Sequence, residues 1–217
     1  MSLIELDNIY FGYEEGLPVL EDLSVSIEKG SCLAITGDNG SGKTTLLRIL
    51  NGLAFPSRGK YFFDGTEIDR EYLKDNRNSK RFHKRVGFLF QNPDTMLFNP
   101  RVYDEIAFGP RQMGLSDEEV DKRVSDTLAL FEIEDLKEKV PYHLSGGQKK
   151  WVALASVLAL NPEVLIMDEP LAGLDRKRQE WLINFLKDLK DSGKTLILAT
   201  HSLDRAEGLA DEILELE

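Results

Sequence analysis

The sequence has a single cysteine and no long hydrophobic run. Cys32 lies in a short apolar stretch, residues 31–35, so a disulfide within the chain is excluded and a buried, inert thiol is expected. No apolar run approaches the roughly 18 residues that a membrane-spanning helix needs, and no basic segment followed by an apolar segment near Met1 marks a secretory signal. We therefore expect a chain that neither spans a membrane nor is exported, and that works in a reducing cytoplasm.

Basic residues are also in short supply, because 27 Lys and Arg face 38 Asp and Glu and leave a net charge of -11. Nucleic-acid binding relies on lysines and arginines that replace counterions along the phosphate backbone, so no nucleic-acid partner is expected. One basic stretch, residues 80–85, runs against this trend. It is either a solvated face of a connecting segment or a contact for lipid headgroups or a partner protein, and we favour the first.

With 217 residues, 41% of them hydrophobic, the chain can form one globular unit with an appended subdomain. Near the start, Leu23, Val25 and Ile27 alternate with polar neighbours, which predicts antiparallel strands. Residues 61–65 predict a further strand that runs into an Asp-Gly turn. These patterns favour an antiparallel β subdomain at the N-terminus.

Four other short runs are apolar on both alternating faces, which is typical of parallel strands covered on both faces by helices. They are residues 33–36, 86–90, 164–167 and 195–199. Between residues 103 and 160 the pattern is helical, and Ser116 with Glu119 forms a capping box at the start of one helix. We therefore predict one α/β domain over residues 1–217, with a mostly parallel sheet flanked by helices and a helical subdomain inserted at about residues 100–160.

A phosphate-binding loop follows the first of these apolar strands. Residues 37–44 match G-x-x-x-x-G-K-[ST] and precede an amphipathic helical segment, as a P-loop NTPase core requires. Glycines let successive backbone N–H groups point inward, and the helix N-terminus faces the same anion. We expect this loop to bind ATP through Gly37, Asp38, Asn39, Gly40, Ser41, Gly42, Lys43, Thr44 and Thr45. The Lys43 ammonium suits the outer phosphates, and the Thr44 hydroxyl suits Mg²⁺.

Two acidic residues end the apolar run of residues 164–167. Asp168 is expected at the carboxyl end of a buried strand, where open parallel sheets gather their ligands, and there it can hold Mg²⁺. Glu169 is the natural group to orient and polarise a water molecule that attacks the terminal phosphate. We therefore predict Glu169 as a catalytic residue.

The segment of residues 144–148, LSGGQ, resembles the signature of ATP-binding-cassette (ABC) proteins. Ser145 and Gln148 form a second capping box, and Gly146 and Gly147 leave backbone N–H groups accessible to an anion. The resemblance implies that these four residues contact the nucleotide bound by a second subunit. A P-loop kinase of small molecules would satisfy the phosphate loop but gives no reason for this segment.

The order of further motifs agrees with the same family over nearly the whole chain. Tyr13 resembles the aromatic residue that stacks on adenine. Aromatic residues are common near strand ends, and the neighbouring Tyr10 or Phe11 could instead be core residues. Gln91 resembles the glutamine that contacts Mg²⁺ or water and the coupling surface, and residues 171–175 resemble the loop that crosses to the partner cassette. His201 resembles the switch histidine that contacts the terminal phosphate.

Two segments narrow the resemblance to the ATPases of energy-coupling-factor importers, which take up cobalt, nickel or vitamins. Residues 90–98 and 104–110 carry this similarity. Trp151 departs from the family pattern, because a basic residue is common at that position, and this leaves the packing of its helix open. Many relatives have a C-terminal extension that aids dimerisation, so a constitutive dimer does not follow from the sequence.

The resemblance implies a peripheral ATPase at the cytoplasmic face of the membrane that energises an importer. Its partners would be a second ABC subunit, identical or paralogous, in a head-to-tail pair, and an integral membrane transport protein. The alternative is a soluble ABC ATPase of DNA maintenance or translation. Chromosome and repair ATPases place a long coiled coil between the glutamine and signature segments, whereas the segment here has the size of a helical subdomain.

Overall fold

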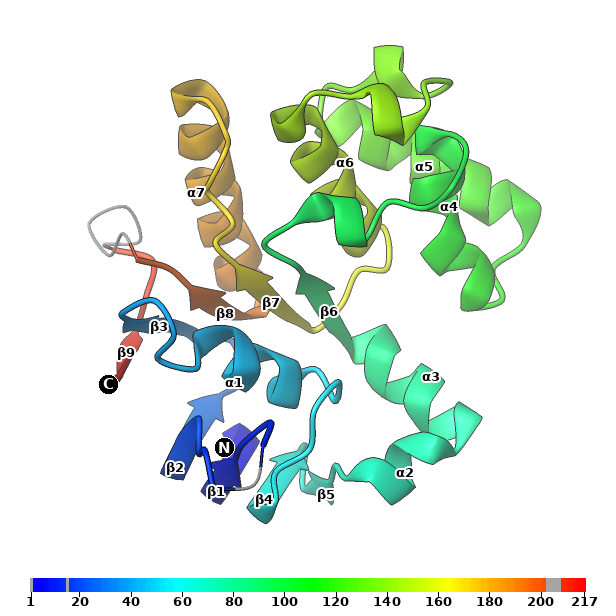
Figure 1. The fold of residues 1–217 in the computed structure, drawn as a ribbon. Helices are drawn as coiled ribbons and strands as arrows, with labels where there is room; N and C mark the ends of the chain where they lie inside the picture. The colour runs from blue at the N-terminus through cyan, green and yellow to red at the C-terminus, as the bar shows by residue number, and fades with distance from the viewer. Residues whose placement is uncertain (1, 15, 202–207) are drawn as a thin grey trace.

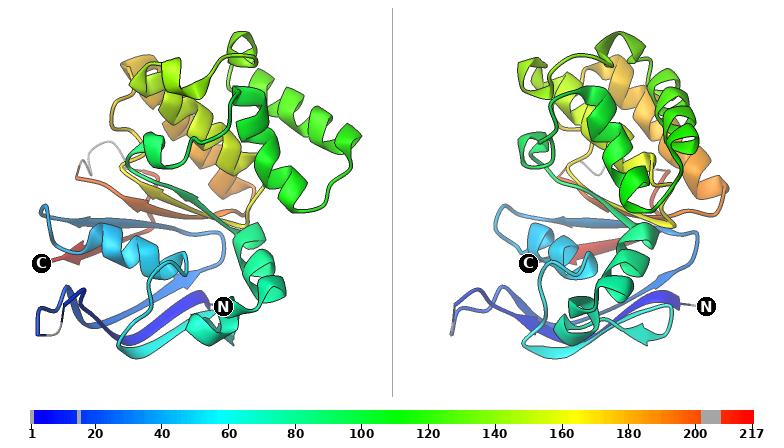
Figure 2. Two further views of the ribbon diagram at one scale, coloured as in Figure 1. Left: turned by 45° about the vertical axis from the view of Figure 1, so that its right-hand side comes forward. Right: turned by 90° about the vertical axis from the view of Figure 1, so that its right-hand side faces the viewer.

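The fold consists of two sheets and three groups of helices, as seen in a computed structural model that describes residues 2–14, 16–201 and 208–217 (Figures 1 and 2). An antiparallel sheet and a parallel sheet lie one above the other, with helix α1 (Lys43–Leu50) between them. A group of helices lies on the far side of the parallel sheet. The α/β architecture predicted from the sequence is therefore confirmed.

The antiparallel sheet contains four strands in the order β2-β1-β4-β5. Their bounds are β1 Ser2–Phe11, β2 Leu20–Glu28, β4 Arg58–Phe63 and β5 Thr66–Glu67. The turn between β4 and β5 places Asp64 at φ 51° and Gly65 at φ 72°. Two consecutive positive φ angles are what a two-residue hairpin requires, so the predicted Asp-Gly turn is confirmed.

The parallel sheet contains five strands in the order β6-β7-β8-β3-β9. Their bounds are β3 Cys32–Gly37, β6 Val86–Leu89, β7 Val164–Asp168, β8 Thr195–Ala199 and β9 Glu212–Leu216. β3, β6, β7 and β8 are the four runs predicted from their continuous apolar character. Helices cover both faces of this sheet, so the side chains that point to either face of these strands need to be apolar.

Two hydrophobic cores lie on opposite faces of the parallel sheet. One core joins the sheet to α1 and to the antiparallel sheet, and includes Ile4, Ile35 and Leu47. The other core joins the sheet to α7 (Arg176–Asp191) and to the helices α4 (Val102–Gln112), α5 (Asp117–Leu130) and α6 (Gly146–Leu158). The predicted helical stretch is thus confirmed, and the capping box of Ser116 with Glu119 begins α5. The short 3-10 turn η1 (Pro93–Thr95) lies between β6 and α4, and η2 (Glu134–Leu136) and η3 (Pro141–His143) lie between α5 and α6.

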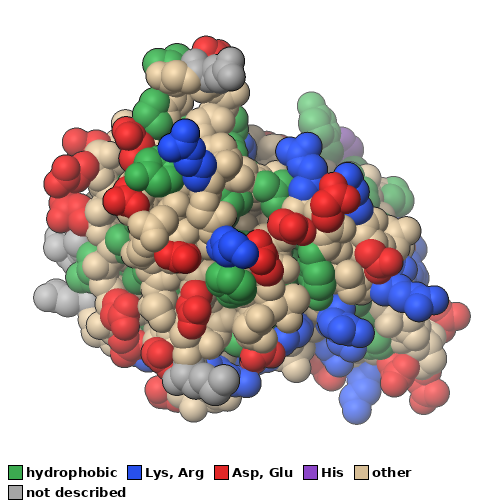
Figure 3. Space-filling view, turned by 90° about the horizontal axis from the view of Figure 1, so that it is seen from below, with side chains coloured by type: hydrophobic (Ala, Val, Ile, Leu, Met, Phe, Trp, Pro, Cys, Tyr) green, Lys and Arg blue, Asp and Glu red, His purple; other side chains and the backbone are tan. Residues whose placement is uncertain are grey.

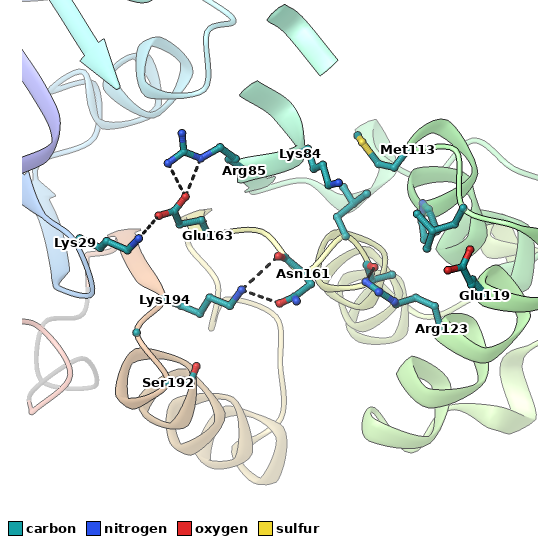
Figure 4. A pocket seen from close by; sticks show the side chains of 15 residues that line it. Lys29, Lys84, Arg85, Met113, Glu119, Arg123, Asn161, Glu163, Ser192 and Lys194 are labelled. Atoms are coloured by element: carbon teal, nitrogen blue, oxygen red, sulfur yellow. Dashed lines mark hydrogen bonds and ion pairs between the residues drawn. The ribbon is translucent and has the colours of Figure 1, made fainter. Parts of the chain in front are cut away.

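The basic stretch of residues 80–85 is the end of helix α3 (Asn76–Arg85), which follows the short helix α2 (Arg70–Lys74). Arg85 is half-buried and pairs with Glu163 at 2.7 Å and with Asp64 at 2.8 Å. Glu163 also pairs with Lys29 at 2.8 Å (Figure 4). The stretch was predicted to be a solvated face, and this is wrong for Arg85, because its guanidinium neutralises a half-buried carboxylate between α3 and β7.

These ion pairs line a cavity of about 720 Å³ at the edge of the parallel sheet where β6, β7 and β8 begin. Arg123 and Lys194 also face it, and each donates to a backbone carbonyl, Ala159 O and Asn161 O respectively (Figure 4). These contacts satisfy carbonyl groups after the end of α6, as cations near helix C-termini commonly do. Acidic and basic side chains are interspersed over the described residues of the face seen from below (Figure 3).

Candidate functional site

The predicted site residues gather at the opposite edge of the parallel sheet, where its strands end. The phosphate loop follows β3, Gln91 lies two residues beyond β6, Asp168 ends β7, and His201 lies two residues beyond β8. A cavity of about 400 Å³ opens there, and it is lined by Tyr13, Val19, Asn39, Gly40, Gly42, Lys43, Thr44, Thr45, Gln91, Asp168 and Glu169. Its position agrees with the general rule that ligands of open parallel sheets bind beyond the carboxyl ends of the strands.

Glycine is required in the phosphate loop for two different reasons. Gly37 has φ 137°, and a Cβ atom there would lie 2.2 Å from the backbone oxygen of Leu216 in β9. Gly42 has φ 95° and is the N-cap of α1, so the left-handed conformation turns the chain into the helix. The loop therefore holds its shape through the close approach of β9 and the start of α1.

The loop folds around the ammonium group of Lys43. Lys43 Nζ donates to Gly37 O and to Asp38 O, each at 2.7 Å, so the charge lies inside the ring of backbone atoms. Ser41 Oγ is buried and has no hydrogen-bond partner among the described residues. An orphaned hydroxyl, a lysine and the start of α1 within one loop form a set of donors that fits the phosphates of a nucleotide.

Thr44 and Asp168 bring two oxygen atoms together from opposite parts of the sequence. Thr44 Oγ1 donates to Asp168 Oδ2 at 2.8 Å. Burial raises the pKa of Asp168, while the hydrogen bond from Thr44 and the charges of Lys150 and Lys43 oppose this shift. A hydroxyl and a buried carboxylate beside a phosphate site are the hard oxygen ligands that Mg²⁺ uses, so these residues fit the predicted metal.

Glu169 occupies an unusual backbone conformation directly after β7. Its φ is 48°, a region that costs a non-glycine residue about 1–2 kcal/mol. The Glu169 N–H donates to Ala199 O at 2.9 Å, and Glu169 Oε1 accepts the backbone N–H of His201 at 3.0 Å. His201 Nδ1 lies 2.7 Å from the same oxygen. The structure therefore brings together the two residues predicted to act on the terminal phosphate.

Tyr13 and Gln91 both line the cavity. The ring of Tyr13 is 59% exposed, and its hydroxyl lies 3.2 Å from Thr45 Oγ1 and accepts from Arg48 at 3.1 Å. An exposed aromatic ring held next to the phosphate loop can stack on an adenine base. Gln91 is exposed and lines the cavity beside Asp168, which is compatible with the predicted contact to Mg²⁺ or water.

The signature segment begins helix α6 outside this cavity. Ser145 Oγ accepts the Gln148 N–H, and the Gln148 side chain accepts the Ser145 N–H at 3.0 Å, so the predicted capping box is confirmed. Ser145, Gly146, Gly147 and Gln148 do not line the cavity at the phosphate loop. The residues predicted to bind anions therefore form two separate groups in a single chain.

Sequence reasoning missed Lys150, which is only 4% exposed. Lys150 Nζ donates to the carbonyl oxygens of Glu169 and Ala172. Burial lowers the pKa of Lys150 to about 8, an effect that the charges of Glu169 and Asp168 partly oppose. The signal was helical spacing, because Lys150 lies on one face of α6 with the buried residues Leu154 and Val157.

Trp151 is also buried, at 3% exposure, which resolves its departure from the expected basic residue. Its Nε1 donates to Phe131 O at 2.8 Å, and its ring packs edge-on against Trp181 with centroids 5.1 Å apart. Arg178 of α7 lies over the Trp151 ring at 5.6 Å. The tryptophan therefore packs α6 onto α7 and the end of α5.

Comparisons with known proteins agree on one family. The family model described as ABC transporter matches residues 20–172, a range that contains the phosphate loop, Gln91, the signature segment, Asp168 and Glu169. A protein of Clostridium acetobutylicum named as an ABC transporter ATP-binding protein is 54% identical over 207 residues, which are 95% of this chain and 86% of that protein. The nickel import ATP-binding protein LarO of Lactiplantibacillus plantarum is 46% identical over 212 residues, 98% of this chain and 88% of that protein.

A third relative is the energy-coupling factor transporter ATP-binding protein EcfA of Methanocaldococcus jannaschii, 40% identical over 213 residues, 98% of this chain and 75% of that protein. The structure of cbiO1 from Clostridium perfringens, part of the ABC transporter complex cbiONQ, has a TM-score of 0.85 at 35% identity and covers 100% of this chain and 85% of that one. A dimeric ATP-binding cassette in a post-hydrolysis state, bound to ADP and Pi, has a TM-score of 0.90 at 29% identity, with 99% and 94% covered.

Proposed function

This chain belongs to the ABC transporter family and is an ATPase whose hydrolysis of ATP is coupled to transport, and we propose that it energises an importer of the energy-coupling-factor type. One observation carries the proposal. The contacts of Thr44 with Asp168 and of Glu169 with His201 lie at the same edge of the sheet, and the signature segment lies outside the cavity there. The cargo we propose is a metal ion or a vitamin. Support comes from the names of LarO, a nickel import protein, and of EcfA.

We assign the following roles within the cavity. The Tyr13 ring stacks on adenine, and residues 37–45 bind the phosphates through backbone N–H groups and the Lys43 ammonium. Thr44 and Asp168 would hold Mg²⁺ together with Gln91, and the bound ion would supply positive charge against the phosphates.

Hydrolysis itself is assigned to Glu169 and His201. The Glu169 carboxylate orients and polarises the attacking water, and His201 holds that carboxylate while facing the terminal phosphate. Because His201 donates its backbone N–H to Glu169, the carboxylate is positioned before a nucleotide arrives. Such preorganisation lowers the barrier without a cost at the moment of reaction.

The second half of each catalytic site comes from a partner cassette in our proposal. Ser145, Gly146, Gly147 and Gln148 lie outside the cavity of their own chain, so they are placed to contact a nucleotide held by another subunit. A dimeric cassette bound to ADP and Pi is a close structural neighbour, which supports a head-to-tail pair. Residues 1–217 would then act as one cassette, with the helices at about residues 100–160 carrying the signature segment.

Membrane attachment is assigned to a partner protein. No helix among the residues described has both the length and the apolar character needed to cross a bilayer. Phe98 and Phe108 are 67% and 41% exposed and lie edge-on with ring centroids 5.0 Å apart, in the segment that follows Gln91. We propose that this aromatic pair contacts an integral membrane protein and keeps the ATPase at the cytoplasmic face.

The test is purification of the tagged chain from detergent-solubilised membranes of its own cells. We expect a multispanning membrane protein and a cassette subunit to copurify, and Phe98→Asp with Phe108→Asp to release the membrane protein. Lys122→Asp, an exposed position on α5, serves as the surface control. Copurification of ribosomes or DNA in place of a membrane protein would contradict the importer and support a soluble ATPase. Uptake of nickel, cobalt and vitamins by cells with and without the chain would then identify the cargo.

A further inference from the structure

Lys150 connects the signature helix to the loop that carries Glu169. It belongs to α6, and its ammonium donates to two backbone carbonyls in the segment after β7, Glu169 O and Ala172 O, the latter at 3.0 Å. A buried ammonium must keep its acceptors, because water cannot replace them inside the protein. Helix α6 and the segment after β7 therefore move together.

The backbone that receives Lys150 is the strained one. Glu169 has φ 48°, and its carbonyl also accepts the Ala172 N–H at 3.2 Å. A left-handed glutamate persists only where its surroundings hold it, and here the supports are Ala199 O on its N–H and Lys150 on its carbonyl. Rotation of the peptide after Glu169 would break the Lys150 contact.

The start of α6 touches the same loop at a second point. A Cβ atom on Gly147 would lie 3.3 Å from Gly173 O, so the glycine allows the helix to rest against the loop. Gly147 belongs to the signature segment, and Gly173 belongs to the loop of residues 171–175. The signature segment, Lys150 and the Glu169 loop thus form one contact unit within a single chain.

We infer that Lys150 is a positioning residue that links the two composite ATPase sites. The signature segment contacts the partner's nucleotide, and Lys150 couples a movement of α6 to a movement of the Glu169 loop in its own chain. This inference rests on the head-to-tail pair of the proposed function. Binding of ATP in one site would then shift α6 and, with it, the loop that holds the water-activating carboxylate of the other site. The link explains why a lysine lies among apolar residues of α6, where a hydrophobic residue would pack at lower cost.

The test compares Lys150→Met, an unbranched side chain one atom shorter that removes the donors, with Lys150→Arg, which keeps charge and donors. Steady-state ATPase activity of the full chain is measured across ATP concentrations, together with ATP binding and thermal midpoint. For Lys150→Met we expect kcat to fall at least 10-fold and the Hill coefficient for ATP to approach 1, while ATP affinity changes less than about 3-fold. Lys150→Arg should recover most of kcat, and Lys122→Met on α5 should leave every parameter unchanged.

A folded Lys150→Met variant with unchanged kcat and Hill coefficient would overturn the link. If Lys150→Met does not fold, Lys150→Gln, which retains a neutral N–H donor, takes its place, and a wild-type Hill coefficient with wild-type kcat would again reject the inference. Failure of the proposed function looks different, because the Glu169→Gln variant would then bind ATP without forming a dimer, whatever the result at Lys150.

Discussion

His201 Nδ1 lies 2.7 Å from Glu169 Oε1, and the His201 backbone N–H donates to the same oxygen at 3.0 Å. These contacts join the residues after two neighbouring strands, β7 and β8, and Glu169 also lines the cavity at the phosphate loop. One carboxylate oxygen thus has two contacts with His201, while the other accepts no hydrogen bond from the residues that the structure describes and can meet a water molecule. One oxygen of Glu169 therefore positions the carboxylate, and the other is available to polarise a water molecule.

Replacement of Glu169 by Gln should stop hydrolysis and spare nucleotide binding. An amide oxygen can still accept the His201 N–H, so the loop keeps its shape, but it is a far weaker base than the carboxylate. We expect kcat to fall by about 10²–10⁴-fold, and ATP with Mg²⁺ to hold the variant as a dimer on gel filtration. A variant that stays monomeric at concentrations far above its ATP affinity would contradict the shared site.

Removal of the Lys43 ammonium should weaken ATP binding directly. Lys43 lies within the ring of loop carbonyls, and charge-assisted hydrogen bonds contribute about 1.5–3 kcal/mol. For Lys43→Ala we expect the dissociation constant for ATP to rise by roughly 10–150-fold in a fluorescence titration. Lys60→Ala, an exposed lysine paired with Glu67, should titrate like the wild type. An unchanged titration for Lys43→Ala would count against the assigned phosphate loop.

Asp168→Asn should raise the concentration of Mg²⁺ that hydrolysis needs. The carboxylate of Asp168 accepts from Thr44, and the amide substitution keeps an oxygen there but removes the charge that attracts the cation. ATPase activity measured against MgCl₂ at fixed ATP should shift to higher Mg²⁺ by about 10-fold or more. Asp191→Asn, an exposed residue at the end of α7, is the matched control. Identical Mg²⁺ curves for both variants would remove Asp168 from the metal site.

Trp151→Ala should destabilise the protein strongly although Trp151 lies outside the cavity. The ring is buried between Phe131 and Trp181, and truncation leaves a large void and an unpaired Phe131 carbonyl. Urea unfolding should show a loss of about 3–5 kcal/mol in the free energy of unfolding. Trp181→Phe keeps an aromatic ring in the same cluster and should cost less than about 1.5 kcal/mol. A loss under about 1 kcal/mol for Trp151→Ala would show that α6 does not depend on this packing.

The Cys32 thiol should resist modification in the folded protein. Burial raises the pKa of Cys32 to about 12, so at pH 8 the thiol stays protonated and the reactive thiolate is scarce. Reaction with a disulfide reagent should be at least 10-fold slower in the native protein than in urea, where the thiol has its ordinary pKa. Equal rates under both conditions would show that the start of β3 opens readily.

Local chemistry explains most of what could be predicted about the site. The phosphate loop carries its own geometry in Gly37, Gly42 and Lys43, and the two capping boxes form between residues only three positions apart. Strands such as β7 were recognisable because burial on both faces demands an unbroken apolar run. The sequence indicated only that Glu169 and His201 each follow a strand of the same sheet. Whether the two side chains come into contact depends on the order of the strands, which the sequence does not give.

The amino-acid order was sufficient for the apolar strands β3, β6, β7 and β8, the helical stretch, the phosphate loop and the family, because each depends on neighbouring residues or on a short motif, whereas helices α2 and α3 were not predicted. The roles of Lys150 and Arg85 emerged only from the folded chain. Lysine and arginine side chains are normally exposed. The packing of α6 against the Glu169 loop nevertheless buries Lys150, and the packing of α3 against Glu163 partly buries Arg85. Helical spacing marks Lys150 as a member of the buried face of α6, but which backbone groups its ammonium meets depends on segments far apart in the chain, so tertiary contacts alone settle which charged side chains support the site.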